Sequence, residues 1–342
     1  MRGYSLLALL ITFLSSDLAF TQTISVKSIS DEDTQVLVRE GWQLVYSTDQ
    51  VRIVDFDISR SGLIISTIVD GEYHLILLNK EHLVQKDKRI AKVDKLRVAF
   101  PYFFNSGNQK VFGPCDKLYF EIDMDKYKIN RRRYPFKINR RPFIQIGEGY
   151  DTYYKQDSYY KTKSKDFGAV TEFDRVKKIQ YQYLLDYSLS EPDTLYEISY
   201  DTDMMIFSSV YPFLQFEVLE DKGLLYILDN QNGVLSHLDN SGRIQEVNLA
   251  EFDIQKSGLF RSFTFNLEKD IFSDQVYLIC TPYGKDNDSK IFKIRYDGNL
   301  EIIKNEKLKS ISSSSKIHNG KVYDIFKIKE SRKTAVYSIG IE

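Results

Sequence analysis

One stretch, Gly223–Val247 (GLLYILDNQNGVLSHLDNSGRIQEV), constrains the fold more than any other part of the 342-residue chain. An apolar run, Leu224–Leu228, ends at the polar segment Asp229–Gly233. A second run, Val234–Leu238, ends at Asp-Asn-Ser-Gly, and a third begins at Arg243. Asn, Asp and Gly tolerate the positive φ angles that tight hairpins need. The stretch therefore predicts three consecutive antiparallel strands, which form a meander.

The meander recurs along the chain. Apolar residues that precede a turn in the same way as Leu238 are Leu77, Ile122, Ile198, Ile294 and Ile339. These six positions are separated by 45, 76, 40, 56 and 45 residues. Three of the separations lie near the length of one four-stranded propeller blade, about 40–45 residues, and the two longer ones indicate blades with insertions.

We therefore expect an all-β fold: a six-bladed β-propeller of four-stranded antiparallel blades, with the ring closed by an N-terminal strand. The last repeat reaches Glu342 without its fourth strand, and an unpaired edge invites aggregation. Two spare strands, Thr34–Val38 and Trp42–Tyr46, precede the first blade, and one of them is expected to pair with the last. The alternative is a β-sandwich pair or an irregular all-β fold.

The segment YILDNQNGVLSHLDNSGRIQEV resembles the repeat of NHL-type six-bladed β-propellers, in which a strand ending in Asp-Asn leads to a strand ending at a polar-Gly turn. The chain as a whole resembles the secreted six-bladed propeller proteins of Bacteroidetes, whose function is unassigned. Residues 223–247 and 290–303 carry the match, and the other four copies are degenerate. The resemblance implies an architecture and brings no catalytic motif.

Residues 1–22 have the parts of a secretory signal peptide. Arg2 supplies the positive start, Leu6–Leu14 the short apolar core, and Ala19-Phe20-Thr21 the cleavage site. The alternative is a buried N-terminal strand or helix. No later run approaches a transmembrane length. We expect residues 23–342 to form a single propeller domain that is secreted or periplasmic, monomeric and without a transmembrane segment.

The two cysteines, Cys115 and Cys280, are assigned to blades 2 and 5, on opposite sides of a six-blade ring. A disulfide requires Cα atoms within roughly 7 Å. We therefore expect two free, mostly buried thiols. The serine run Ser310–Ser315, before blade 6, is expected to be an exposed loop.

The most unusual segment is an insertion predicted at residues 126–182, between blades 2 and 3. Residues 126–178 hold fifteen Lys and Arg against six Asp and Glu, in a chain whose net charge is −1. Arginine binds carboxylate or phosphate through two parallel hydrogen bonds, and tyrosine stacks on sugars. The expected ligand is a protein or an anionic glycan, and the near-zero net charge argues against nucleic acid. The candidate binding residues are Arg131, Arg132, Arg133, Tyr134, Lys137, Arg140 and Arg141.

Two alternatives remain open for these charged residues. The arginines could form a solvated strand face that pairs with acidic neighbouring blades, while the tyrosines pack the loop down. Separately, carboxylates on several blades could bind calcium in the central channel, as in lactonase-type propellers, because side chains at i and i+2 of a strand point to one side. The candidates are Asp55 with Asp57, Asp123 with Asp125, Asp201 with Asp203, and Asp229 with Asn230. Asp at strand ends is more commonly part of an Asx turn, so no metal ligand or cofactor is assigned.

No hydrolase or nucleotide-binding motif is present in the sequence. His74 and His237 lie within predicted strands, where a packed or hydrogen-bonded role is expected. The sequence thus favours an exported propeller that acts as a binding or scaffold module over an enzyme. The second hypothesis is a calcium-dependent hydrolase or lyase of the lactonase kind.

Overall fold

The computed structural model describes most of the chain beyond its N-terminal segment. The described residues are 27–29, 35, 37–48, 52–92, 103–106, 109–115, 118–133, 152–161, 166–174, 179–188, 193–201, 214–230, 232–239, 244–249, 256–257, 260–261, 263–282, 288–308, 311–312, 315–328 and 334–341. The predicted signal peptide, residues 1–22, lies outside them and stays a prediction.

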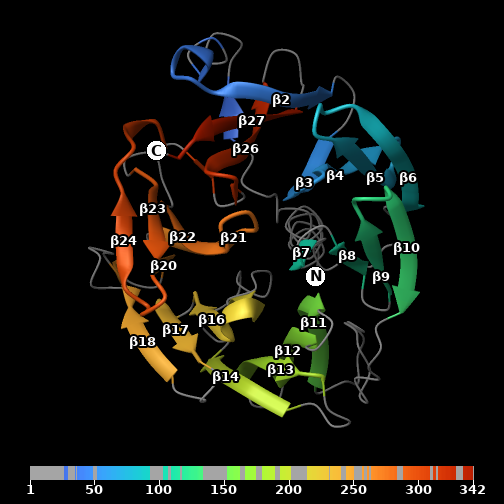
Figure 1. The fold of residues 1–342 in the computed structure, drawn as a ribbon. Coiled ribbons are helices and arrows are strands. Elements are labelled where there is room, and N and C mark those ends of the chain that lie inside the picture. Colours follow the sequence, from blue (N-terminus) through green and yellow to red (C-terminus); the bar gives the residue numbers. More distant parts are fainter. Residues whose placement is uncertain are drawn as a thin grey trace, which may run out of the picture.

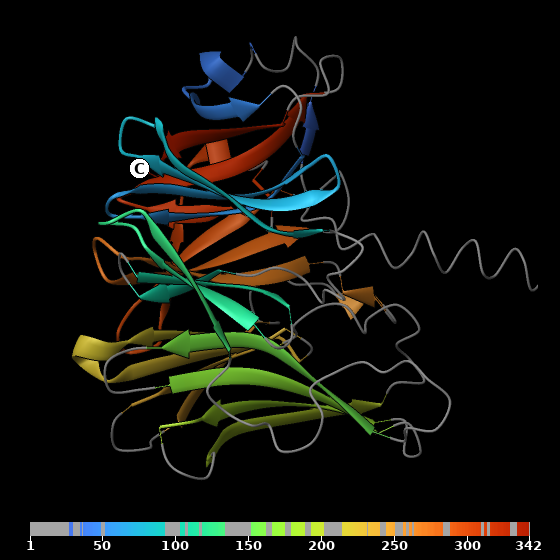
Figure 2. The same cartoon turned by 90° about the vertical axis from the view of Figure 1, so that its right-hand side faces the viewer.

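The described part of the chain is nearly all β, and its sheets stand around a common centre in a propeller-like arrangement (Figure 1). Seen from the side, the sheets follow one another as twisted layers (Figure 2). Five sheets have four antiparallel strands, one has five strands, and β19 (Lys256–Ser257) pairs with β20 (Phe260–Arg261) alone.

The four-stranded sheets run in chain order. The first contains β3 (Arg52–Ser59), β4 (Gly62–Val69), β5 (Glu72–Asn79) and β6 (Val84–Lys92). The second contains β7 (Phe103–Ser106), β8 (Gln109–Cys115), β9 (Leu118–Asp123) and β10 (Lys128–Arg133). The third contains β11 (Thr152–Lys161), β12 (Asp166–Asp174), β13 (Ile179–Asp186) and β14 (Asp193–Asp201).

The next two sheets include the stretch from which the repeat was inferred. The fourth sheet contains β15 (Leu214–Leu219), β16 (Leu224–Asp229), β17 (Val234–Leu238) and β18 (Ile244–Asn248). The fifth contains β21 (Phe263–Asp270), β22 (Gln275–Pro282), β23 (Lys290–Ile294) and β24 (Leu300–Ile303). The predicted meander at 223–247 is confirmed, and Gly233 adopts the positive φ of 66° that its turn requires.

The five-stranded sheet joins the two ends of the described chain. It contains β25 (Lys316–His318), β26 (Lys321–Ile328), β27 (Thr334–Gly340), β2 (Gln43–Thr48) and β1 (Lys27–Ile29). The strand expected at Trp42–Tyr46 forms as β2 and pairs antiparallel with β27, as predicted. β1 pairs parallel with β26. The C-terminal strands therefore do not end in an open edge.

The prediction of a strand at Thr34–Val38 is wrong for the residues of this segment that the structure describes. Residues 37–39 are helical, and the amide of Trp42 donates to the carbonyl of Leu37 over 2.9 Å. This turn buries Leu37 and directs the chain into β2, and Gly41 adopts a φ of 97°.

The described parts of residues 126–182 differ from the predicted insertion. Residues 128–133 form β10, the fourth strand of the second sheet, while β11 and β12 are the first two strands of the third. Ile198 consequently lies in the fourth strand of its sheet, not in the third as its assignment to the repeat predicted. These strands were not recognised because the connection between them, residues 162–165, has no Asn, Asp or Gly that would mark a turn.

The prediction of an exposed loop at the serine run is wrong at the two serines that the structure describes. Ser312 and Ser315 are buried, with 5% and 0% of their surface exposed. The backbone N–H of Ser312 donates to Asp324 Oδ2 over 2.8 Å, and its hydroxyl donates to Asp324 Oδ1 over 2.6 Å. The buried carboxylate of Asp324 therefore stabilises this segment in the interior, which polarity alone did not indicate.

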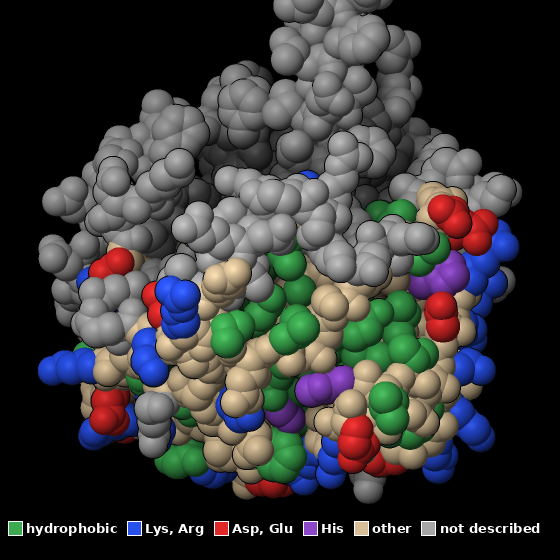
Figure 3. Space-filling model, turned by 90° about the horizontal axis from the view of Figure 1, so that it is seen from above, with side chains coloured by type: hydrophobic (Ala, Val, Ile, Leu, Met, Phe, Trp, Pro, Cys, Tyr) green, Lys and Arg blue, Asp and Glu red, His purple; other side chains and the backbone are tan. Residues whose placement is uncertain are grey.

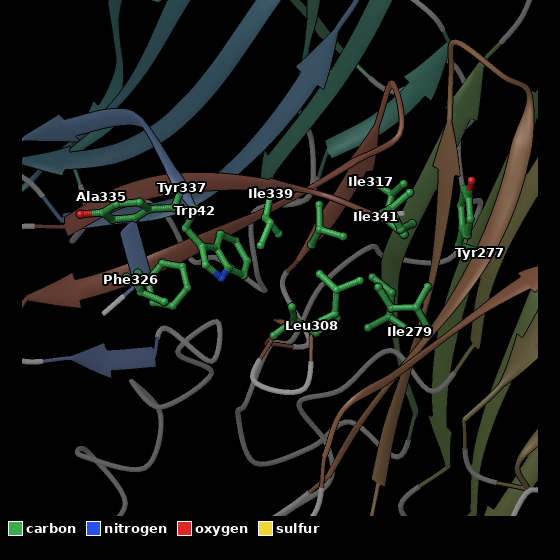
Figure 4. Packing of buried hydrophobic residues seen from close by; sticks show 14 of the residues in the cluster. Trp42, Tyr277, Ile279, Leu308, Ile317, Phe326, Ala335, Tyr337, Ile339 and Ile341 are labelled. Atoms are coloured by element: carbon green, nitrogen blue, oxygen red, sulfur yellow. The ribbon is translucent and has the colours of Figure 1, made fainter. Parts of the chain in front are cut away.

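The core lies between the faces of neighbouring sheets. Within the described residues, each of five apolar clusters is contributed mainly by two sheets that follow one another along the chain or, in one case, by the last and the first. Between the second and third sheets, β11 contacts β7 and β8. The cluster between the fifth and the last sheet contains Trp42, Tyr277, Phe326 and Ile339 (Figure 4).

Side-chain amides reinforce one of these boundaries. Asn230, after β16, accepts from the N–H of Phe265 over 3.0 Å and donates to its carbonyl over 2.9 Å. Gln215 on β15 accepts from the N–H of Leu267 over 3.0 Å. These bonds occupy backbone groups of β21 that face away from its own sheet. Asn230, a candidate calcium ligand from the sequence, therefore has a structural role.

The structure describes the side chain of one of the two cysteines. Cys280 is a free, buried thiol in the cluster between the fourth and fifth sheets, as predicted. Burial raises its pKa to about 12, so the reactive thiolate is suppressed. The side chain of Cys115 lies outside the described residues.

The described surface is mixed in character. Viewed from the side of β2, hydrophobic side chains are interspersed with basic and acidic ones (Figure 3). The exposed large hydrophobic residues include Leu44 and Val84, of which 55% is exposed in each case. Among the residues that the structure describes, no helix is long and apolar enough to cross a membrane.

Trp42 offers a test of how far the N-terminal segment stabilises the last sheet. It is 2% exposed and meets Phe326 edge to face at 5.4 Å. We expect Trp42→Ala to lower the free energy of unfolding by about 3–5 kcal/mol, because it leaves a large cavity. Urea denaturation followed by circular dichroism measures the effect. The control is Leu44→Ser, at an exposed position on β2 two residues further along the chain, and an equal loss in both variants would contradict the prediction.

Candidate functional site

The predicted basic binding residues are described only in part. Arg131 and Arg132 are exposed on β10, the outermost strand of the second sheet, and Arg133 ends that strand. Arg132 Nε lies 2.9 Å from Glu121 Oε2 on the adjacent strand β9. This ion pair lies within one sheet, whereas the alternative expects acidic partners on neighbouring blades. Tyr134, Lys137, Arg140 and Arg141 lie outside the described residues, so the proposed recognition surface stays a prediction.

Two of the predicted carboxylate pairs belong to turns. Asp123 Oδ1 accepts from the backbone N–H groups of Asp125 and Lys126, both over 3.1 Å. Asp229 accepts from the backbone and the side chain of Asn232, over 2.9 and 2.6 Å. These are the Asx turns that their place at strand ends favoured. Of the third pair, only the backbone of Asp201 is described.

The pair Asp55 and Asp57 has a different environment. Both lie on β3, the first strand of its sheet, and are 9% and 7% exposed. They face two further first strands, β21 and β25, which contribute Glu268 and Lys316. We call these four residues the inner charged cluster. It brings together three sheets that follow one another around the centre (Figure 1).

The inner charged cluster is built around one ammonium group. Lys316 Nζ lies 2.8 Å from Glu268 Oε1, which also accepts from Asn266 Nδ2 over 2.7 Å. Each of Asp55 and Asp57 accepts, through Oδ1, the backbone N–H of the residue that follows it, over 2.8 Å. These hydrogen bonds fix the carboxylates on the strand.

Burial and charge act against each other in this cluster. Burial tends to lower the pKa of Lys316, but the carboxylates of Glu268, Asp55 and Asp57 outweigh it and hold the pKa above its ordinary value. Burial raises the pKa of Asp55 to about 7 despite the nearby ammonium. Burial also raises the pKa of Glu268, with Lys316 opposing the shift. The cluster therefore holds a permanent cation beside carboxyl groups that are poised to take up protons.

The cluster does not form a calcium site in the described part of the chain. Calcium takes six to eight oxygen ligands. Here the carboxylates come from two sheets, and the third sheet contributes an ammonium group in place of an oxygen ligand. Among the residues that the structure describes, no group of three or more His, Cys, Asp or Glu is arranged to hold a metal ion.

A second site, an open groove of about 900 Å³, was not anticipated from the sequence. It lies between the turns of the fifth sheet and the edge of the last sheet, near Gly320 and Gly340. Its lining includes Gln275, Tyr277, Lys293, Arg295 and Tyr296, and we call it the Tyr296 groove.

The polar side chains of the Tyr296 groove are partly organised by contacts with one another. Arg295 Nη2 lies 3.0 Å from Glu301 Oε2, and the ammonium of Lys222 lies 3.1 Å from the centre of the Tyr296 ring. Of Tyr296, 48% is exposed. The groove therefore offers an accessible aromatic surface beside both donors and acceptors, which suits a polar ligand.

Comparisons with known proteins give a fold likeness without a family. No protein-family model matches the chain. No curated protein matches it by sequence. A member of the DUF4221 family from Bacteroides vulgatus has a TM-score of 0.45 at 11% identity, over 87% of this chain and 97% of that one.

Two further solved structures are similar to the chain at the same level. A protein from Bacteroides fragilis, named as exported, has a TM-score of 0.44 at 8% identity, over 93% of this chain and 99% of that one. A catalytically inactive virginiamycin B lyase from Staphylococcus aureus, with quinupristin, has a TM-score of 0.39 at 10% identity, over 87% and 99%. At these scores the description of the fold rests on the strand pairing of the chain itself.

Lys316 provides the first test of the inner charged cluster. We expect Lys316→Met to lower the free energy of unfolding at pH 8 by about 3 kcal/mol, because it leaves buried carboxylates without their counter-charge. Urea denaturation measures the change. Lys321→Met, at an exposed position on β26, serves as the control and is expected to change stability by less than about 0.5 kcal/mol. Equal stability of the wild type and Lys316→Met would refute the assignment.

The raised pKa of Asp55 predicts how stability changes with pH. The folded-state pKa, about 7, lies above the ordinary 3.8, so the folded protein holds a proton that the unfolded chain releases. The contribution of protonated Asp55 to the free energy of unfolding is fully present below about pH 4. It is lost as the pH rises to 7, by up to about 1.4 kcal/mol per pH unit. Asp55→Asn should remove that slope. Parallel stability curves for the two proteins, measured by urea denaturation from pH 4 to 8, would contradict the prediction.

Proposed function

We propose that this protein is an exported six-bladed β-propeller that acts as a binding or scaffold module for a protein or glycan ligand. The observation that carries the proposal is the Tyr296 groove, since it combines size, openness and polar chemistry in one place. The proposed domain spans residues 23–342 after removal of the signal peptide, is secreted or periplasmic, and is monomeric. It needs no cofactor.

The architectural part of the proposal rests on sheet contacts. Strand contacts or a shared apolar cluster join each of the five four-stranded sheets and the five-stranded sheet to its neighbour along the chain, and the last contacts the first through β25 and β27 against β3. These sheets would be the six blades. The pairing of β2 with β27 would close the ring, because a strand from the start of the chain completes the last blade.

The chemistry of the groove favours recognition over catalysis. Its described lining has two tyrosines, two cations and several amide or carboxylate groups, which match the hydroxyl, amide and carboxylate groups of a glycan or peptide. A propeller presents its turns as loops on a rigid frame, and binding residues concentrate on such loops. The basic residues Arg131–Arg133 would form a second recognition surface, which prefers anionic ligands.

Calcium-dependent hydrolysis or lyase chemistry is the second candidate. The inner charged cluster alone does not form a calcium site, so this function would require oxygen ligands beyond its three carboxylates. Calorimetry of the mature chain with calcium, against a chelated control, separates the two functions. Tight binding of one ion would favour the enzyme. Absence of binding would favour the binding module, since Lys316 already supplies a positive charge to these carboxylates.

The binding module is tested with an array of neutral and anionic polysaccharides. We expect the mature chain to bind at least one of them, and Tyr296→Ala to weaken that binding roughly ten-fold or more, because an exposed aromatic residue in a groove is a typical hot spot. The matched control is Ile302→Ala on β24, which is 44% exposed and lies outside the groove lining.

The same array distinguishes the two proposed surfaces. A variant with Arg131→Ala and Arg132→Ala should lose anionic polysaccharides selectively, with a strong dependence on salt. If only this variant loses binding and Tyr296→Ala binds normally, the binding site lies on β10 and not in the Tyr296 groove. Retention of binding in every variant would contradict both assignments.

A further inference from the structure

A second, smaller cavity lies on the other side of the β23–β24 turn from the Tyr296 groove. It has a volume of about 350 Å³ and lies between the strands β17 and β18 and the turn residues Asp297–Asn299 of the next sheet. Leu235, His237 and Val247 line it from the strands. Neither the repeat pattern nor the proposed function explains this cavity.

His237 is the unusual residue of the cavity. It is 8% exposed, and among the described residues neither ring nitrogen has a hydrogen-bond partner. Its ring stacks on Tyr226 at 5.1 Å between centroids and 15° between planes. Tyr226, His237 and Gln245 lie directly opposite one another on β16, β17 and β18. The imidazole is therefore held rigidly while its polar atoms lack protein partners, which is costly unless a ligand or water satisfies them.

Gly298 leaves room in front of this histidine. A Cβ atom placed on Gly298 would lie 3.7 Å from His237 Nδ1 and 3.8 Å from Gln245 Oε1. Two polar atoms thus converge on one small space that a side chain would otherwise fill. The φ of Gly298 is 83°, a conformation that favours glycine, so the turn geometry keeps the space open.

The charges around the cavity select the ligand. Its described lining contains two carboxylates, Glu246 and Asp297, and no Lys or Arg. Hydrogen bonds from the backbone and side chain of Asn299 hold the pKa of Asp297 below its ordinary value, so this group is ionised. An anion would be repelled, whereas a cation would find carboxylate, amide and imidazole acceptors.

We propose that the His237 cavity binds a small organic cation, namely an ammonium or guanidinium group from a free amine or from a basic side chain of a partner. The volume is at the lower end for ligand pockets and suits one such group. His237 and Gln245 accept hydrogen bonds at the inner end, and Glu246 and Asp297 supply opposite charge at the rim. This site shares Asp297 with the Tyr296 groove and is otherwise lined by different residues, and the proposal does not depend on glycan or protein binding there.

Calorimetry on the whole mature chain tests the proposal with four probes: putrescine, the blocked tripeptide Gly-Lys-Gly, acetate and glucose. We expect putrescine or the tripeptide to bind, and added salt to weaken the binding. His237→Phe keeps the stacking on Tyr226 and removes both nitrogens, so it should abolish binding. Glu246→Gln, at an exposed position, should weaken it roughly ten-fold.

Controls make each outcome decisive. Glu81→Gln removes an exposed carboxylate from the β5–β6 turn of another sheet and should bind like the wild type. If His237→Phe does not fold, Glu246→Gln still tests the charge requirement. Tighter binding of the tripeptide would identify a side chain as the source, and tighter binding of putrescine a free amine. Binding of acetate or glucose alone, binding unchanged in both variants, or no binding of any probe would overturn the proposal.

Discussion

The ion pair between Lys316 and Glu268 is the constraint on which the arrangement of three sheets depends. A buried ammonium group and buried carboxylates are costly when unpaired, so β3, β21 and β25 can approach one another only in the register that joins these charges. Apolar packing between sheets is less specific, because many relative shifts would bury similar areas. The polar centre thus fixes which packing is adopted, and the clusters between the sheets supply the free energy.

The strands that could be predicted from the sequence are those connected by turns of Asn, Asp and Gly. β16 to β18 are bounded by such turns, and the predicted ends of β16 and β17 and the predicted start of β18 agree with the structure to within one residue. The third sheet was missed because β11, TYYKQDSYYK, lacks the alternation of apolar and polar residues that would distinguish a buried from an exposed face. Local sequence therefore located hairpins, while the assignment of strands to sheets required pairing over longer distances.

The candidate sites were likewise predictable only where the signal lies in local sequence. The i, i+2 spacing correctly singled out Asp55 and Asp57, but Glu268 and Lys316 lie more than 200 residues away along the chain. One overlooked pattern could have found them: Asp57, Glu268 and Lys316 are each the third residue from the end of the first strand of their sheets. The two cavities had no such signature. Each arises where a turn of one sheet meets strands of another, which is a property of the assembled molecule.

The pairing of β2 with β27 has a consequence for the order in which the molecule can be completed. Synthesis proceeds from the N-terminus, so β2 emerges early and its partner emerges almost 300 residues later. Until then the last sheet cannot form, and the loop to be closed is nearly the whole chain. Trp42, the single tryptophan, becomes buried in this final step. A circularly permuted chain that begins at β3 and ends with β2 would convert the slowest contact into a local one.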